Sequence, residues 1–163
     1  MKKFIVASAL LCVMMVAGLA AALPNYAGTW VLDKDKSTGL PPQMMSSTDA
    51  FQWTISQDTK TLTVKSAIMG GTQETPYNLD GSKSKVQVGG QMPGEATVYL
   101  EKKDDGKIVL HTERTVNVQG NDITIKRTQV LELADGGKTL KVKSTTESPR
   151  GTQELSLVFT LKS

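Results

Sequence analysis

The chain has 163 residues, with 19 basic and 16 acidic side chains, one histidine and one cysteine. This length predicts a single domain, and 21% charged with 39% hydrophobic residues is typical of a folded globular protein rather than a disordered one. A net charge of +3 is too small to indicate a nucleic-acid-binding protein.

The first 22 residues have the pattern of a cleavable secretory signal peptide. Lys2 and Lys3 precede an uncharged apolar run at 4–17, and Ala20–Ala22 supplies the small residues that a signal peptidase reads. The alternative is a membrane anchor, since the run is long enough for a marginal spanning helix. We expect cleavage, which leaves 23–163 as one domain in the periplasm or secreted, without a membrane-spanning segment.

Cleavage changes what the composition allows. It removes two lysines and leaves 17 basic against 16 acidic groups, so the case for an anionic polymer as partner disappears. It also removes Cys12, and with it any disulfide, thiol nucleophile or thiolate metal site. His111 has no second histidine or carboxylate cluster to complete a metal or general-base site, and no catalytic set or dinucleotide motif occurs. We therefore expect no enzymatic activity, no metal and no cofactor.

After the signal peptide, polar and apolar residues alternate with a period of two, which predicts strands. Ala27–Asp33 is the first expected strand, and Lys34–Ala50, with its two prolines, is expected to be a single covering loop. Short turns containing Gly, Asn and Asp make neighbouring strands antiparallel. The pattern predicts an all-β protein, a single up-and-down antiparallel barrel of about 8 to 10 strands. The later strands are expected around 51–55, 62–64, 77–79, 86–88, 96–100, 108–118, 123–133, 140–148 and 153–161.

Three hairpins allow strand registers to be calculated. Turns centred on Gly120–Asn121, Gly136–Gly137 and Pro149–Arg150 all keep apolar residues opposite apolar ones, which supports the three registers together. The first of them places Arg114 directly opposite Arg127. The combined registers bring together a group of inward-facing polar residues, here called the polar island: Thr112, Arg114, Arg127, Gln129, Ser144, Thr146 and Gln153.

Two of the three arginines of the chain belong to the polar island. Guanidinium groups about 5 Å apart would repel by roughly 3 kcal/mol at an effective dielectric constant near 20, so something must offset their charge. A bound carboxylate or phosphate head group would do so, because arginine pairs with both bidentately. A bulge could instead bring Glu74 or Glu95 inside as an ion-pair partner. Alternatively, a flattened barrel could place the island near an open rim, and the pattern leaves all three interpretations open.

The segment Tyr26-Ala27-Gly28-Thr29-Trp30 resembles the Gly-x-Trp start of the calycins, the superfamily that includes lipocalins and fatty-acid-binding proteins. The resemblance implies that Trp30 plugs one end of the barrel. It also implies that inward arginines, here Arg114 and Arg127, hold a ligand carboxylate, as in the fatty-acid-binding branch.

The chain departs from both branches. The second lipocalin motif and the C-terminal lipocalin helix are missing, and the last strand has no Arg-x-Tyr of the fatty-acid-binding kind. The connection at 34–50 is too short for the helix-turn-helix lid of that branch. The closest description is a bacterial secreted protein that is similar to the lipocalins in architecture.

We therefore expect a secreted or periplasmic protein that holds a small amphipathic, anionic ligand, such as a fatty acid or lipid, inside the barrel. The alternative is a protein-interaction or inhibitor module with a packed barrel that acts through its surface loops, above all 34–50. The tail of a ligand would lie against Phe51, Trp53, Leu110, Leu131, Val142 and Leu157. The expected ligand-binding residues are Arg114, Arg127, Gln129, Ser144, Thr146, Thr112, Gln153 and Trp53.

Overall fold

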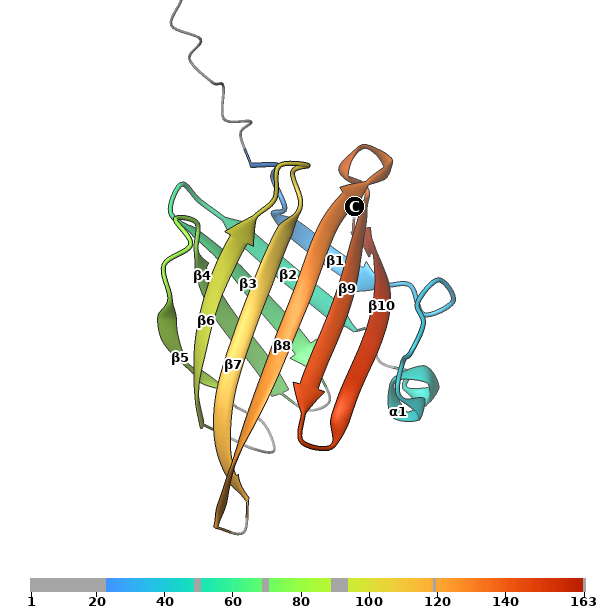
Figure 1. The fold of residues 1–163 in the computed structure, drawn as a ribbon. Coiled ribbons are helices and arrows are strands. Elements are labelled where there is room, and N and C mark those ends of the chain that lie inside the picture. Colours follow the sequence, from blue (N-terminus) through green and yellow to red (C-terminus); the bar gives the residue numbers. More distant parts are fainter. Residues whose placement is uncertain (1–22, 49–50, 69–70, 89–93, 119, 163) are drawn as a thin grey trace, which may run out of the picture.

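The structure is a computed structural model that describes residues 23–48, 51–68, 71–88, 94–118 and 120–162 (Figure 1). The expected signal peptide at 1–22 lies outside the described residues. Within the described ranges, no helix is both long and apolar enough to cross a membrane.

Antiparallel strands make up most of the described chain, so the all-β prediction is confirmed. The strands are rich in Thr, Val and Ile, whose branched side chains suit a pleated surface with one buried face. Two short helical turns, α1 (Pro42–Ser46) and η1 (Asp135–Gly137), are the only described helical elements. The strands are β1 (Gly28–Leu32), β2 (Gln52–Gln57), β3 (Thr61–Ile68), β4 (Gly71–Asn78), β5 (Ser84–Val88), β6 (Gly94–Lys102), β7 (Ile108–Val118), β8 (Asn121–Ala134), β9 (Thr139–Ser148) and β10 (Gly151–Leu161).

The ten described strands form one sheet in the order β4-β3-β2-β1-β10-β9-β8-β7-β6-β5. Except for β4 and β5, strands that follow one another in the chain are hydrogen-bonded neighbours, and the pairing of β1 with β10 curls the sheet into an up-and-down barrel (Figure 1). The backbone ladder is interrupted only between β4 and β5, at a site here called the seam. The Gln73 amide on β4 reaches across the seam and donates to the Gln87 carbonyl oxygen on β5 at 3.4 Å.

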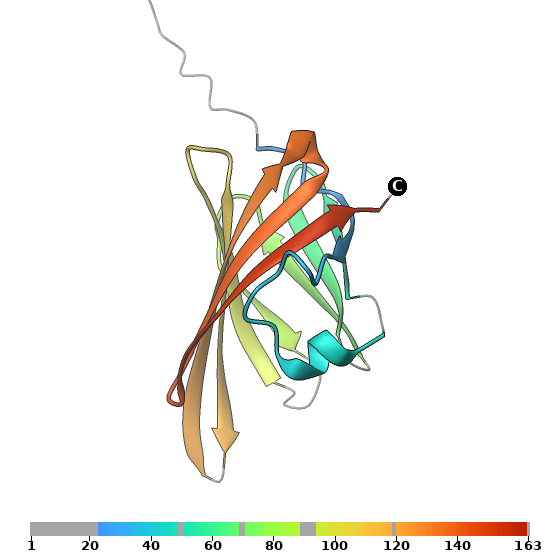
Figure 2. The same ribbon diagram turned by 90° about the vertical axis from the view of Figure 1, so that its right-hand side faces the viewer.

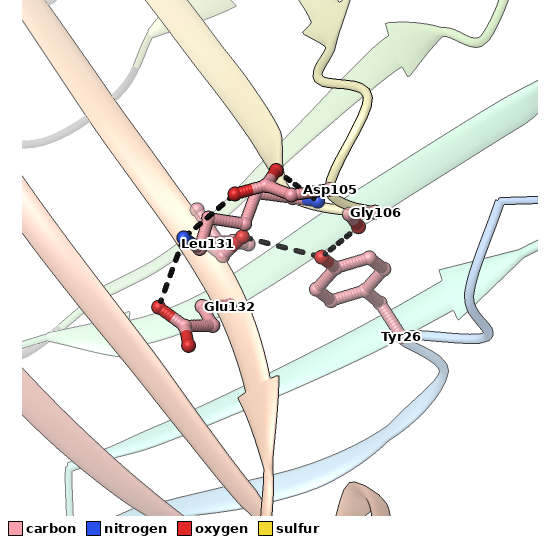
Figure 3. A network of polar contacts seen from close by, with 6 residues as sticks. Tyr26, Asp105, Gly106, Leu131 and Glu132 are labelled. Carbon is pink, nitrogen blue, oxygen red and sulfur yellow. Dashed lines mark hydrogen bonds and ion pairs between the residues drawn. The ribbon is translucent and has the colours of Figure 1, made fainter.

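Tyr26 lies beside Gly106 and Leu131 at one end of the barrel, here called the closed end (Figure 3). Trp30 contacts Tyr26 there. The Tyr26 hydroxyl lies 2.9 Å from the Gly106 carbonyl oxygen and 3.2 Å from that of Leu131, so its single proton is shared between two acceptors. The Trp30 indole N–H donates to the Tyr26 carbonyl oxygen at 3.0 Å. Both residues are 1% exposed, so these two aromatic rings are shielded from water.

The opposite end is not filled in the same way, and we call it the open end. Along the inward face of β8, Leu131 is fully buried, Gln129 is half-buried and Arg127 is exposed. Along β10, Phe159 is buried, whereas Gln153 at the other end is exposed. Inward side chains that keep accessible surface show that water enters this half of the barrel.

The connection from β1 to β2 runs beside the open end (Figure 2). Thr38 and Ser156 of β10 exchange backbone hydrogen bonds of 2.8 and 3.0 Å, which fixes the segment along the edge of β10. The expected covering loop therefore contains one helical turn, α1, which begins at Pro42, whose fixed φ suits the first turn of a helix. Met44 packs against the hydrophobic core, whereas Met45 is 53% exposed.

The Tyr26 hydroxyl predicts a specific pH dependence of stability. Burial, reinforced by the charges of Asp105 and Glu132, raises the pKa of Tyr26 from 10.0 to about 12. Between these values the unfolded chain has lost the proton and the folded chain has kept it, so the free energy of unfolding falls as the pH rises. The loss is about 2 to 3 kcal/mol, and below about pH 10 the contribution is complete.

Urea denaturation at several pH values between about 9 and 12 measures this dependence. The Tyr26→Phe variant is the control, because it removes the titrating hydroxyl and keeps the ring. We expect a shallower decline in the variant than in the native protein. Parallel declines would contradict the assignment.

Candidate functional site

Two of the three calculated registers are correct. Arg127 lies opposite Thr146 across β8 and β9, and Thr146 lies opposite Gln153 across β9 and β10. The register between β7 and β8 is wrong by two residues. Arg114 lies opposite Ile125, and Arg127 lies opposite Thr112.

The turn between β7 and β8 explains the error. Val118 pairs with Asn121, so Asn121 already belongs to β8 and the turn is not centred on Gly120–Asn121. Gly120 has a φ of +82°, and its N–H is bound by the Asn117 side-chain oxygen at 3.0 Å. Glycine therefore occupies the second turn position, where a positive φ is required. A shift of two residues leaves every side chain on the same face, so the polar island still points inward.

The corrected register separates the two arginines. Arg114 and Arg127 are diagonal neighbours, with Cβ atoms about 7 to 8 Å apart instead of about 5 Å. Their repulsion at an effective dielectric constant near 20 is then about 2 kcal/mol. The two charges still affect each other, because the pKa of Arg127 is lowered first by burial and second by the charge of Arg114.

Arg127 combines two properties that rarely occur together. Its side chain is exposed, yet surrounding protein lowers its pKa by burial. Both hold when a side chain points into a wet space enclosed by protein walls. Of the described residues, the charged or ionisable groups that shift the pKa of Arg127 are Arg114 and Tyr77, and neither is a carboxylate.

The two glutamates considered as internal partners lie on the outer face. Glu95 forms an ion pair with Lys85 at 2.7 Å, and its side chain is 50% exposed. Glu74 is exposed and lies opposite Lys65 across β3 and β4. Glu74 and Glu95 therefore do not neutralise the arginines, and the interpretation of an internal ion pair with either of them is wrong.

The other residues of the polar island extend from the core to the open end. Ser144 is 3% exposed and lies opposite Gln129, at the edge of the packed core. Thr146 and Thr112 are half-buried on either side of Arg127, and Gln153 is exposed. The island therefore spans the boundary between the packed core and the wet half. Its inner residues lie in the barrel interior, and its outer residues lie near the open rim.

Trp53 lies away from the island. It is 8% exposed, and its ring packs on that of Phe159 with centroids 4.9 Å apart. The other side chains expected to line the tail are also buried in the packed core: Phe51, Leu110, Leu131, Val142 and Leu157. Near the open end, inward apolar side chains that keep accessible surface include Ile123, Ile125 and Leu155.

Tyr77 lies in the strand expected around 77–79, but it is not among the site residues expected from the sequence. Its hydroxyl lies 3.3 Å from Thr112 Oγ1, and its side chain is 3% exposed. Burial raises the pKa of Tyr77, while the hydrogen bond between Tyr77 and Thr112 and the charge of Arg127 act in the opposite direction. Because β4 does not pair with β7, no hairpin register could bring Tyr77 and Thr112 together.

A second candidate site lies at the closed end, beside Tyr26 (Figure 3). Its volume is about 180 Å³, below the roughly 300 Å³ of the smallest usual ligand pockets. Lys107 is held there between Asp105 at 2.7 Å and Glu132 at 3.6 Å. Lys107 already has two carboxylate partners and the cavity is small, so this site is a weaker candidate than the polar island. Among the described residues, no cluster of three or more potential metal ligands occurs.

Comparison with known proteins bears on the fold. No protein-family model and no curated protein matches the sequence. Solved structures do match. Zebrafish ileal bile acid-binding protein, complexed with cholic acid, is 17% identical with a TM-score of 0.54, covering 84% of this chain and 98% of its own.

The fold is a calycin-like barrel. An SAHS protein from Ramazzottius varieornatus is 11% identical with a TM-score of 0.57, over 83% of this chain and 94% of its own. The REP1-NXSQ fatty acid transporter is 12% identical with a TM-score of 0.53, and the match covers 84% of this chain and 96% of the transporter. The motif from Gly28 to Trp30 predicted a calycin-like barrel, and these similarities confirm the prediction for the fold.

The corrected register can be tested by disulfide formation. With Cys12 replaced by serine, we expect Thr115→Cys with Thr124→Cys to form a disulfide on mild oxidation, because these residues are paired and their hydroxyl oxygens lie 3.3 Å apart. Thr115→Cys with Lys126→Cys is the matched pair for the register centred on Gly120–Asn121. Titration of free thiols measures both. Faster oxidation of the second pair would restore the earlier register.

Proposed function

We propose that the open end of the barrel binds a small amphipathic anion, a fatty acid or a lipid with an anionic head group. Arg127 and Arg114 would hold the head group, and Gln129, Ser144 and Thr146 would assist. The proposal includes the secreted or periplasmic location that the first 22 residues predict.

The observation that carries the proposal is the environment of Arg127. Burial of the guanidinium group and the charge of Arg114 lower the pKa of Arg127, and no carboxylate is among the described groups that shift it. A ligand carboxylate or phosphate would supply the missing negative charge and could accept two parallel hydrogen bonds from the guanidinium fork. Water reaches the group, so an anion of small cross-section has a path to it.

The arrangement of apolar side chains supports an amphipathic ligand and suggests its orientation. Side chains on the closed side of the island, such as Leu131 and Val142, are 0% and 1% exposed. On the other side of Arg127 along β8, Ile125 and Ile123 keep accessible surface. An apolar tail would therefore extend from the arginines toward the open end, not into the core.

The structural neighbours support a ligand of this class. One is a bile acid-binding protein complexed with cholic acid, and another is named a fatty acid transporter. Both ligands combine an apolar body with a carboxyl group, the combination that the polar island and its apolar surroundings would accommodate.

A second candidate function is interaction with another protein through the β1–β2 connection. The observation that favours it is Met45, which is 53% exposed on α1. In this reading the barrel is a scaffold, no lipid binds, and removal of the side chain in Met45→Ser weakens capture of the partner.

The head-group role of the arginines predicts a loss of affinity. We expect Arg127→Leu and Arg114→Leu each to weaken binding of oleate by more than about 1 kcal/mol, roughly fivefold, because a charged hydrogen bond is lost. Binding of oleyl alcohol, which has the same tail and no charge, should change little. Calorimetric titration of the delipidated protein measures both affinities.

Lys126→Leu is the matched control. Lys126 precedes Arg127 in the chain, but it is exposed on the outer face, so it should not affect either ligand. Native mass spectrometry of the freshly purified protein shows in addition whether an acid co-purifies. Oleate affinity that is unchanged in both arginine variants would falsify the proposed function.

A further inference from the structure

A polar contact beside the arginines joins two strands that the backbone ladder does not connect. Tyr77 belongs to β4 and Thr112 to β7, on opposite sides of the seam. Their hydroxyl oxygens are 3.3 Å apart, and Tyr77 is 3% exposed while Thr112 is half-buried. The contact therefore links a buried phenol to a half-buried hydroxyl group that lies directly opposite Arg127.

The direction of the hydrogen bond follows from the chemistry of the two groups. A phenol is a stronger donor than an aliphatic hydroxyl, and Thr112 can accept through either of two lone pairs. Burial raises the pKa of Tyr77, so the phenol keeps its proton at neutral pH. With Tyr77 donating, the hydrogen of Thr112 turns away from the phenol and can be donated elsewhere.

Thr112 is placed to donate that hydrogen to an anion at Arg127. The two residues are directly opposite across β7 and β8, where paired Cβ atoms lie about 5 Å apart. An ionised carboxylate offers about four lone-pair sites, and a guanidinium fork occupies only two of them. A neutral donor beside the fork would bind a further site without adding to the repulsion between Arg114 and Arg127.

We propose that Thr112, a member of the polar island, donates its hydroxyl hydrogen to the anionic head group, and that Tyr77 is a positioning residue that orients it. This inference rests on the proposed function and names the neutral donor of the same site. Chains of hydrogen bonds strengthen one another in an interior of low dielectric constant, so removal of the phenol weakens the bond that Thr112 makes.

The test uses three variants: Tyr77→Phe, Thr112→Val and the double variant. Each substitution removes a hydroxyl group and nearly preserves shape. We expect each single variant to weaken oleate binding about three- to tenfold and to leave oleyl alcohol nearly unchanged. The double variant should bind oleate no more weakly than Thr112→Val, because Tyr77 acts only through Thr112.

Matched controls exist on the outer face. Tyr99→Phe removes a tyrosine hydroxyl from β6, and Thr128→Val removes a threonine hydroxyl from β8 opposite His111. Neither should change the affinity for oleate. The melting temperature of each ligand-free variant is recorded as well, since a purely structural role for the Tyr77–Thr112 contact would lower stability and weaken both ligands alike.

The outcomes separate this inference from the function on which it rests. Equal losses for oleate and oleyl alcohol, or additive losses in the double variant, overturn the role of Tyr77 in positioning Thr112. Unchanged oleate affinity in both single variants, with weakened binding in Arg127→Leu, overturns this inference and leaves the proposed function standing. Unchanged affinity in Arg127→Leu and Arg114→Leu overturns the proposed function itself.

Discussion

The alternation of side chains along the strands is the constraint on which the rest of the structure depends. Every second residue of ten strands points into one enclosed volume, and that volume must be filled by side chains or by water. The chain has only eight aromatic residues, and Tyr26, Trp30, Trp53 and Phe159 all serve the packed region. Toward the other end, inward positions carry Thr, Gln and Arg instead. The barrel is consequently closed and dry at one end and wet at the other.

The same alternation explains how far the sequence could predict the registers. A slip of one residue would turn polar side chains into the core, so the inward set, including Arg114 and Arg127, could be identified. A slip of two residues keeps Val116 opposite an isoleucine in either case, Ile123 or Ile125. The matching of apolar residues therefore cannot distinguish the two registers of β7 and β8. The position of Gly120 within the turn distinguishes them. The registers around Pro149–Arg150 and Gly136–Gly137 were correct because those turns were centred correctly.

What the sequence could not show is the closure of the barrel. Hairpin registers relate each strand to its neighbour in the chain, but Tyr77 meets Thr112 only because the sheet curls until β4 approaches β6 and β7. The outward positions of Glu74 and Glu95 follow from strand parity, yet a bulge could have reversed either. Residues at a seam are the least accessible to local reasoning, since no backbone hydrogen bond fixes their relation.

The distribution of packing decides which part of an amphipathic ligand would lie deepest. In a barrel filled with water throughout, a tail could enter first and leave its head at the mouth. Here Leu131, Val142 and Leu157 already occupy the space beyond Ser144, and opening it would expose side chains that are 0% to 7% accessible. Arg127 marks the inner limit of the wet half, and the accessible apolar side chains, Ile125 and Ile123, lie on its outer side. A head group would therefore bind innermost, with the tail toward the open end, where the β1–β2 connection and Met45 could contact it.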